Sequence, residues 1–292
     1  MAGESFDSLE TFRRRGGAAL GPGPAALLIV EDTVELASSL DHLAARGFRA
    51  IVAVAPDDIA LPDHPAAPAR VVMDTRRPDA VAEAVSAAIA AAPPGTWLHY
   101  AFNAEYLFHP FSETRSVGEM LAFHAEERRD AMLTPVVDLY AADLARAPSG
   151  VDRADALFDR IGYYALARPD PDHHNHSRER QLDIFGGLRW RFEEHVAPTR
   201  RRIDRVSLFR ARPGLRLRPD HTFTDEEYNT YACPWHHNLT AAVCSFRAAK
   251  ALRANPISRD EIGSFAWEGS EPFRWESRQL MELGLMEPGQ WF

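Results

Sequence analysis

The feature of this chain that most constrains its fold is a regular alternation of short apolar runs and helical patterns near its N-terminus. Residues 25–30 form a continuous apolar run without polar alternation, which is typical of a strand buried on both faces. The series continues with segments that are alternately helical and apolar in pattern: 33–46, 48–55, 70–73, 78–92 and 97–102. Such a β-α-β-α-β order predicts a mostly parallel, doubly wound sheet flanked by helices, with ligands at the carboxyl ends of its strands.

The sequence also predicts how the chain is divided. Residues 1–24 are rich in Arg, Gly and Pro, which favours a mobile N-terminal arm. Residues 25–255 are expected to form one domain, and the aromatic-rich residues 256–292 are expected to pack back onto it. In the less regular second half we expect three strands and one long helix, at 132–139, 203–209, 215–217 and 239–254 respectively.

The amino-acid composition indicates which classes of molecule this protein is not expected to bind. The chain has 292 residues, of which 46% are hydrophobic, and a formal net charge of −9, so it has no global attraction to nucleic acid or anionic lipid. Its longest apolar stretch, at 25–30, is far too short to cross a bilayer, and the N-terminus lacks the pattern of a signal peptide. With only two cysteines, we expect a cytoplasmic protein with reduced thiols.

Polar residues follow two of the predicted strands. Glu31 and Asp32 come at the end of the first strand, where a carboxylate can reach a ribose hydroxyl or a base edge. Alternatively, Asp32 only caps the next helix, because Glu35 three residues later completes a capping-box pattern. Asn103 and Glu105 follow the strand at 97–102, and their oxygen atoms are of the kind that Mg²⁺ or Mn²⁺ prefers.

Residues 97–108 resemble the DXD region of bacterial family 2-like glycosyltransferases, in which a strand ends in Asp-x-Asp followed by an aromatic and aliphatic run. Residues 134–140, and residues 205–214 leading to Asp220 and His221, add to the resemblance, which covers roughly residues 25–250. It implies a single-domain GT-A (Rossmann-like) fold and a hexosyltransferase-type activity. The expected reaction moves a sugar from a nucleotide-sugar donor to a hydroxyl acceptor, such as a glycan or cell-surface polysaccharide.

The DXD position itself is degenerate in this chain, which has Asn103-Ala104-Glu105 there. The resemblance implies a metal shell of Asn103, Glu105 and His221, but a neutral amide binds a divalent cation more weakly than a carboxylate does. Three alternatives stay open: a weak Mn²⁺ or Mg²⁺ site, a metal-independent enzyme, and a protein that has lost catalysis.

The remaining candidates are assigned by residue type and position. Arg205 and Arg210 are the expected phosphate contacts, because the guanidinium fork suits phosphate. Asp138 and Glu194 are candidates for the base that deprotonates the acceptor. His236 and His237 are candidates for lining the nucleotide pocket, or for a zinc half-site together with Cys233.

Two alternatives to a transferase remain. One is a catalytically inactive GT-A-fold protein that binds a nucleotide, a glycan or a partner protein. The other is a zinc hydrolase built on the histidine clusters, which would require stoichiometric zinc in the purified protein.

Overall fold

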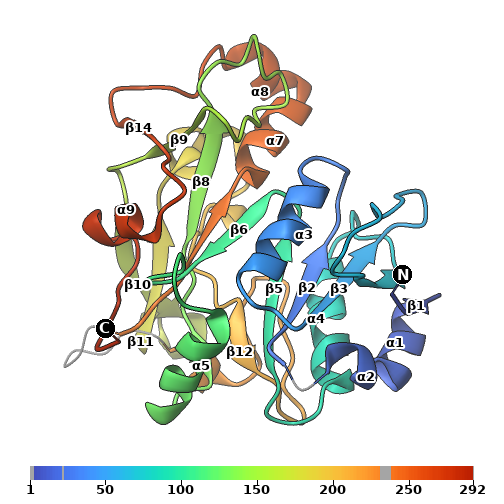
Figure 1. Ribbon diagram of the computed structural model, residues 1–292. Helices are drawn as coiled ribbons and strands as arrows, with labels where there is room; N and C mark the ends of the chain where they lie inside the picture. Colours follow the sequence, from blue (N-terminus) through green and yellow to red (C-terminus); the bar gives the residue numbers. More distant parts are fainter. Residues whose placement is uncertain (1–2, 22, 231–237, 292) are drawn as a thin grey trace.

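A seven-stranded mixed sheet lies at the centre of the computed structural model, which describes residues 3–21, 23–230 and 238–291 (Figure 1). In spatial order its strands are β1 (Ser5–Phe6), β4 (Ala69–Val72), β3 (Ala50–Ala55), β2 (Ala25–Ile29), β5 (Trp97–Phe102), β12 (Leu208–Arg210) and β7 (Ala131–Met132). The pairings from β1 to β5 are parallel, whereas β12 is antiparallel to both of its neighbours. The predicted α/β fold, with a sheet flanked by helices in one domain, is confirmed.

Helices cover both faces of this sheet, which explains why β2 is apolar at every position. Leu27 and Ile29 face the core cluster that includes α1 (Leu9–Arg15), α2 (Gly17–Leu20) and α4 (Ala80–Ala91). Leu28 points to the opposite cluster, which includes α3 (Leu36–Ala45) and α5 (Val117–Glu126). Because successive side chains of a strand point to opposite faces, a strand between two helical layers has no polar face.

A second, five-stranded sheet packs beside the first and was not expected from the sequence. Its strands, in spatial order, are β14 (Ser270–Pro272), β9 (Ala156–Asp159), β8 (Val136–Ala141), β13 (Ala242–Ser245) and β6 (Glu105–Phe108). The second half of the described chain also contains the hairpin β10 (Tyr164–Asp170) and β11 (His176–Phe185), four short 3-10 helices, and the helices α6 (Leu188–Arg191), α7 (Arg247–Ala254), α8 (Pro256–Glu261) and α9 (Ser277–Glu282). The last residues therefore contribute an edge strand, β14, to the second sheet.

The N-terminal segment differs from the mobile arm that the sequence predicts. β1 pairs with β4, and the rings of Phe6 and Phe12 meet edge to face with centroids 5.3 Å apart. Phe12 and Leu20 are completely buried in the core of the first sheet. The Gly and Pro content of residues 1–24 predicted an arm, but Phe6, Phe12 and Leu20 are large apolar side chains that are buried in the folded protein. Their burial decides the structure of the segment.

The helix expected at 239–254 is another difference, because its first half is the strand β13. Ala242 to Ser245 are all completely buried, so both faces of this stretch are covered, and β8 and β6 pair with its two edges. Helix α7 begins at Arg247, where charged residues first appear. The strand expected at 132–139 is likewise two shorter strands, β7 and β8. Helix α3 begins at Leu36 without a side-chain cap, and Asp32 instead accepts a hydrogen bond from the Val34 N–H.

Candidate functional site

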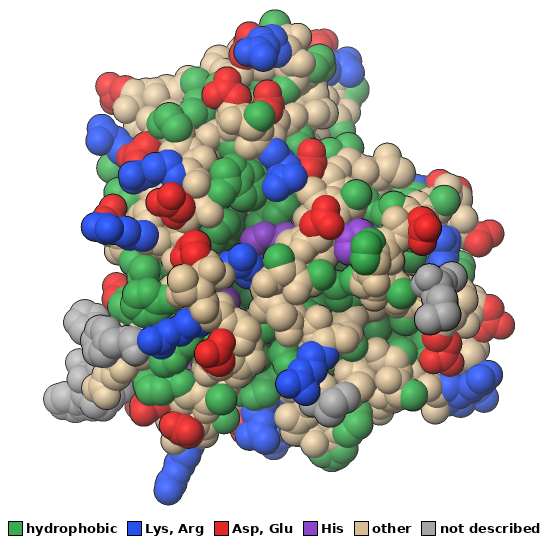
Figure 2. Space-filling model, in the orientation of Figure 1, with side chains coloured by type: hydrophobic (Ala, Val, Ile, Leu, Met, Phe, Trp, Pro, Cys, Tyr) green, Lys and Arg blue, Asp and Glu red, His purple; other side chains and the backbone are tan. Residues whose placement is uncertain are grey.

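The chain reverses its direction of winding at β2, which lies between β3 and β5 in the sheet. From β2 the chain passes through α3 to β3, whereas from β5 it turns at Asn103 and Ala104 into β6 of the second sheet, which packs against α3. Such a change in strand order, a switch point, is where ligands bind in open α/β sheets, in the crevice at the carboxyl ends of the strands. Figure 2 shows that this face of the molecule is hollowed, between the part that carries α3 and the upper part that carries α7, and that histidine and basic side chains reach the surface there.

Asn103 joins the two strand ends at this crevice. Its side-chain oxygen accepts a hydrogen bond from the Glu31 N–H at 2.9 Å, and its amide nitrogen donates to an Asp32 carboxylate oxygen at 2.7 Å and to the Val34 carbonyl at 2.9 Å. A carboxylate could accept the first of these bonds but could not donate the other two. The amide is therefore used to hold the strand ends together.

Glu105, the first residue of β6, is buried and fully engaged by protein groups. One carboxylate oxygen accepts from Arg205 at 2.8 Å and from the Phe102 N–H at 2.9 Å, and the other accepts from the Ser245 hydroxyl at 3.0 Å. Burial alone would raise the pKa of Glu105, but the charge and hydrogen bond of Arg205 outweigh it and hold the pKa below its usual value. Glu105 is thus an ionised carboxylate neutralised by a guanidinium.

Helix α7 brings two cations onto the carboxylates at the end of β2. Arg247 binds Glu31 with two hydrogen bonds, at 2.8 and 2.7 Å, and Lys250 lies 2.9 Å from an Asp32 oxygen. Although burial alone would raise the pKa of Asp32, the Lys250 ammonium holds it below its usual value. The two cations are three residues apart and therefore share one face of the helix. The sequence alone does not single out these two residues, because only the fold reveals which acids they meet.

Asp138 lies on the same sheet as Glu105, two strands away. In the register of β8, β13 and β6, Ser245 pairs with Asp138 on one side and with Glu105 on the other. Asp138 is completely buried, and Arg189 lies 3.3 Å from it. Burial raises the pKa of Asp138, and the Arg189 charge only partly offsets this.

His221 is placed next to this group of charges by its stacking on Tyr100. The two rings are nearly parallel, and the Tyr100 hydroxyl lies 3.0 Å from Nδ1 of His221. Burial, followed by the charges of Arg205 and Arg247, lowers the pKa of His221 to about 3. The imidazole is therefore neutral at physiological pH.

These residues do not fit a divalent cation. The oxygens of Asn103 and Glu105 are taken by protein donors, and the guanidinium of Arg205 lies against the Glu105 carboxylate. Within residues 3–21, 23–230 and 238–291, no group of three or more His, Cys, Asp or Glu side chains is placed to hold a metal ion. Positive charge at the crevice comes instead from Arg205, Arg247 and Lys250, with Arg189 beside Asp138.

Two candidates from the sequence lie elsewhere. Arg210 pairs in register with Trp97 at the amino end of β5, opposite to the crevice, and forms an ion pair with Asp130 at 3.0 Å. The Glu194 carboxylate is exposed and lies 3.7 Å from His195. Neither joins the residues at the switch point. His236 and His237, like Cys233, lie outside the described residues.

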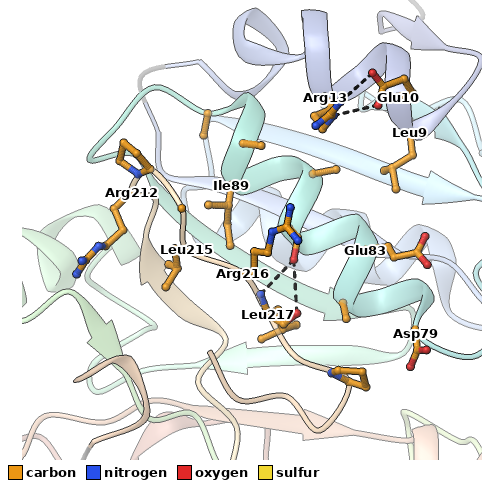
Figure 3. Close-up of a pocket in the computed structure, with 18 of the residues that line it drawn as sticks. Leu9, Glu10, Arg13, Asp79, Glu83, Ile89, Arg212, Leu215, Arg216 and Leu217 are labelled. Atoms are coloured by element: carbon orange, nitrogen blue, oxygen red, sulfur yellow. Dashed lines mark hydrogen bonds and ion pairs between the residues drawn. The ribbon is translucent and has the colours of Figure 1, made fainter. Parts of the chain in front are cut away.

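A separate groove of about 850 Å³ lies between α1, α4 and residues 212–219 (Figure 3). Its wall is largely apolar, with Ile89 and Leu215 among its residues, and the Ser86 hydroxyl ties α4 to the Leu217 backbone at 3.1 Å. None of the strand-end residues of the switch point lines this groove. The crevice, rather than the groove, is therefore the candidate functional site.

In comparisons with known proteins, no protein-family model matches the chain, and no curated protein matches it at a significant level. Across the part of the chain that the structure describes, no helix has both the length and the apolar character needed to span a membrane. What the fold and the site define is an α/β protein with a charged crevice at the switch point of its sheet.

Proposed function

We propose that this protein is a GT-A-type glycosyltransferase that moves a hexosyl group from a nucleotide-sugar to a hydroxyl acceptor without a divalent cation. What supports the proposal is the pair of buried and half-buried ion pairs at the switch point, at positions where the resemblance leads us to expect metal ligands. Glu105 stands where the resembled family has its metal-binding carboxylates, and Arg205 lies on it at 2.8 Å. Arg247 lies on Glu31 and stacks over the Phe102 ring, 3.7 Å from its centroid.

In this proposal the leaving nucleoside diphosphate is stabilised by guanidinium groups. Arg247 is the better placed of the two, because its side chain is one-third exposed whereas that of Arg205 is only 6% exposed. One guanidinium group can donate two parallel hydrogen bonds to two phosphate oxygens, and it keeps its charge at all physiological pH values. Arg205 stabilises the site by neutralising the buried Glu105 carboxylate.

Asp138 is the proposed base. Its raised pKa favours proton uptake, and its neighbour Arg189 is partly exposed, so a small movement of Arg189 would open the carboxylate to an acceptor. The acceptor oxygen attacks the anomeric carbon, the bond from that carbon to the diphosphate oxygen breaks, and the diphosphate leaves with the electron pair. The acceptor proton passes to Asp138. Inversion at the anomeric centre is the expected stereochemistry for such a single displacement.

A catalytically inactive binding protein is the second candidate, and one observation favours it. Asp138 is completely buried in the described structure, and Arg247 and Lys250 are already paired with acids. A protein that only binds a nucleotide or a glycan at the crevice would need no accessible base.

The test is release of nucleoside diphosphate from a panel of nucleotide-sugars, measured with the full chain in the presence of EDTA. We expect turnover of one donor that Arg247→Ala and Asp138→Asn each reduce at least a hundredfold. Arg278→Ala, which removes a highly exposed arginine of α9, is the matched control and should keep wild-type turnover. Donor binding without release of diphosphate by any acceptor mixture would favour the binding protein, and turnover only with Mn²⁺ would contradict the metal-independent mechanism.

A further inference from the structure

Two buried polar atoms near the proposed base have no hydrogen-bond partner among the described residues. One is Oδ1 of Asp138, which lies 3.3 Å from Nε of Arg189 without accepting a hydrogen bond from it. The other is the hydroxyl of Tyr163, the residue directly before β10. A buried polar atom without a partner costs stability, so a pair of such atoms beside a candidate base calls for a functional explanation.

The two side chains pack against the same turn, Gly186–Gly187, which lies between β11 and α6. A Cβ atom added to Gly186 would lie 2.2 Å from the Tyr163 ring, and one added to Gly187 would lie 2.9 Å from Oδ2 of Asp138. Burial, and then the charges of Asp159 and Asp138, raise the pKa of the Tyr163 hydroxyl. Tyr163 and Asp138 are therefore neighbours across two successive residues of the backbone.

The two atoms are complementary to a single hydroxyl group. Because its pKa is raised, Tyr163 keeps its proton and can donate a hydrogen bond, whereas an ionised Asp138 can only accept one. The oxygen of a hydroxyl group, or of water, can accept from the phenol and donate to the carboxylate at the same time. A phosphate oxygen, which only accepts, would satisfy Tyr163 but would be repelled by Asp138.

We propose that Tyr163 and Asp138 together bind the reacting hydroxyl of the acceptor, or the water molecule that takes its place in hydrolysis. Tyr163 holds the oxygen, and the proton of that oxygen passes to Oδ1 of Asp138 as the oxygen bonds to the anomeric carbon and the diphosphate leaves with its electron pair. Arg189, whose side chain is 15% exposed, is the partner of Asp138 that reaches solvent, so the hydroxyl enters by displacing Arg189. This proposal rests on the proposed transferase, whose reaction requires such a hydroxyl.

The first measurement needs no substrate. Tyr140, on β8, has a hydroxyl that is hydrogen-bonded to Asp159 and Ser270. Tyr163→Phe removes a hydroxyl without such partners, so it should lower the Tm of the full chain by less than Tyr140→Phe does. An equal or larger loss for Tyr163→Phe would show that its hydroxyl has a structural partner in solution, and would overturn the proposal.

The second measurement is hydrolysis and transfer by the full chain, with the nucleotide-sugar that the donor panel identifies and methyl β-D-glucoside as the acceptor. Tyr163→Phe should lower both rates by about tenfold or more and leave the Kd of the donor within about twofold, because the hydroxyl contacts the acceptor oxygen and not the donor. Tyr164→Phe is the matched control: Tyr164 is the next residue, is 43% exposed, and should be replaceable at wild-type rates. Free sugar as the product identifies water as the occupant, and a methyl disaccharide identifies an acceptor hydroxyl.

The results separate this proposal from the transferase. Wild-type rates in Tyr163→Phe, or a loss of donor binding that accounts for its lower rates, would overturn the role of Tyr163 and leave the transferase standing. If the wild type cleaves no nucleotide-sugar, the transferase fails and this proposal fails with it.

Discussion

Glu105 and Arg205 form an ion pair with almost no access to water, since their side chains are 1% and 6% exposed. Two charges can stay buried only when each compensates the other, and the Ser245 hydroxyl and the Phe102 N–H complete the hydrogen bonds of the carboxylate. This pair is thus a structural support under the crevice. The ion pair stabilises the fold only when both Glu105 and Arg205 are present.

We predict that Glu105→Ala or Arg205→Ala lowers the free energy of unfolding by about 3–5 kcal/mol, because each change leaves an uncompensated buried charge. The exposed pair Asp130 and Arg210 is the matched control, with side chains 48% and 40% exposed. Either alanine substitution there should change stability by less than about 1 kcal/mol. Urea unfolding of the four variants checks this, and equal losses for the two pairs would contradict the structural role of Glu105.

Asp138 gives a pH-dependent prediction. Its pKa is raised above the ordinary 3.8 by burial, so the ionised form costs stability above the raised pKa, and this cost disappears as the pH falls through it. Asp138→Asn removes the charge and keeps the shape of the side chain. We expect the variant to have a higher Tm than the wild type at pH 8, with the difference shrinking toward pH 4. A variant that is less stable at pH 8 and matches the wild type at pH 4 would show that Arg189 favours the ionised carboxylate.

At the scale of elements, the turn before α6 decides how closely the chain approaches Asp138. Gly187 has φ +65° and ψ −154°, a conformation essentially restricted to glycine. An added Cβ would be 2.9 Å from an Asp138 carboxylate oxygen. The turn therefore needs glycine for two separate reasons, its backbone conformation and its contact with the proposed base.

A matched pair of substitutions separates these two reasons. Gly21 has nearly the same conformation, φ +56° and ψ −163°, but nothing lies within 4 Å of its Cβ position. Gly21→Ala should cost about 1–3 kcal/mol of stability, from the backbone alone. We expect Gly187→Ala to cost more and also to reduce turnover, because it displaces Asp138. Chemical unfolding and a turnover assay on both variants check this; equal losses of stability with unchanged turnover would mean that the contact with Asp138 is unimportant.

The elements also show what the sequence could and could not predict. β2 and β3 were predictable because a strand covered on both faces is a short, uninterrupted apolar run, and β5 because only His99 interrupts its run. β13 was not, since its four buried residues directly precede the amphipathic helix α7 and together they resemble one helix. The second sheet was not predictable because its central pairings join β13 to β6 and β8, which lie about a hundred or more positions earlier in the sequence.

The residues of the candidate site also fall into two groups, those that the sequence could predict and those that it could not. Glu31, Asp32, Asn103 and Glu105 were predictable, because carboxyl ends of adjacent parallel strands meet at one edge of a sheet. Arg247 and Lys250 were not, because their partners are more than two hundred positions away in the sequence. Arg210 was assigned by residue type, but its position along β12 places it at the other end of β5.

At the scale of the whole molecule, the crevice is built by both sheets. The first sheet supplies Glu31 and Asp32 at the end of β2, and the second sheet supplies Glu105 and Asp138, while α7 covers the boundary with its cations. A chain with a net charge of −9 thus carries a local group of basic side chains at its switch point. Each of these cations is paired with a carboxylate, so an anionic ligand that binds there has to displace an acid from Arg247 or Lys250.

Metal-independent binding of a nucleotide-sugar at the crevice is tested by calorimetric titration of the full chain with nucleoside diphosphates and nucleotide-sugars, first in EDTA and then with Mn²⁺. We expect one donor to bind in EDTA, with a Kd that Mn²⁺ changes by less than about twofold. Arg247→Ala should weaken binding at least tenfold while Arg278→Ala does not, since a lost charged contact costs about 1.5–3 kcal/mol. Binding that requires Mn²⁺, or no binding by any of these ligands, would contradict metal-independent binding at the crevice.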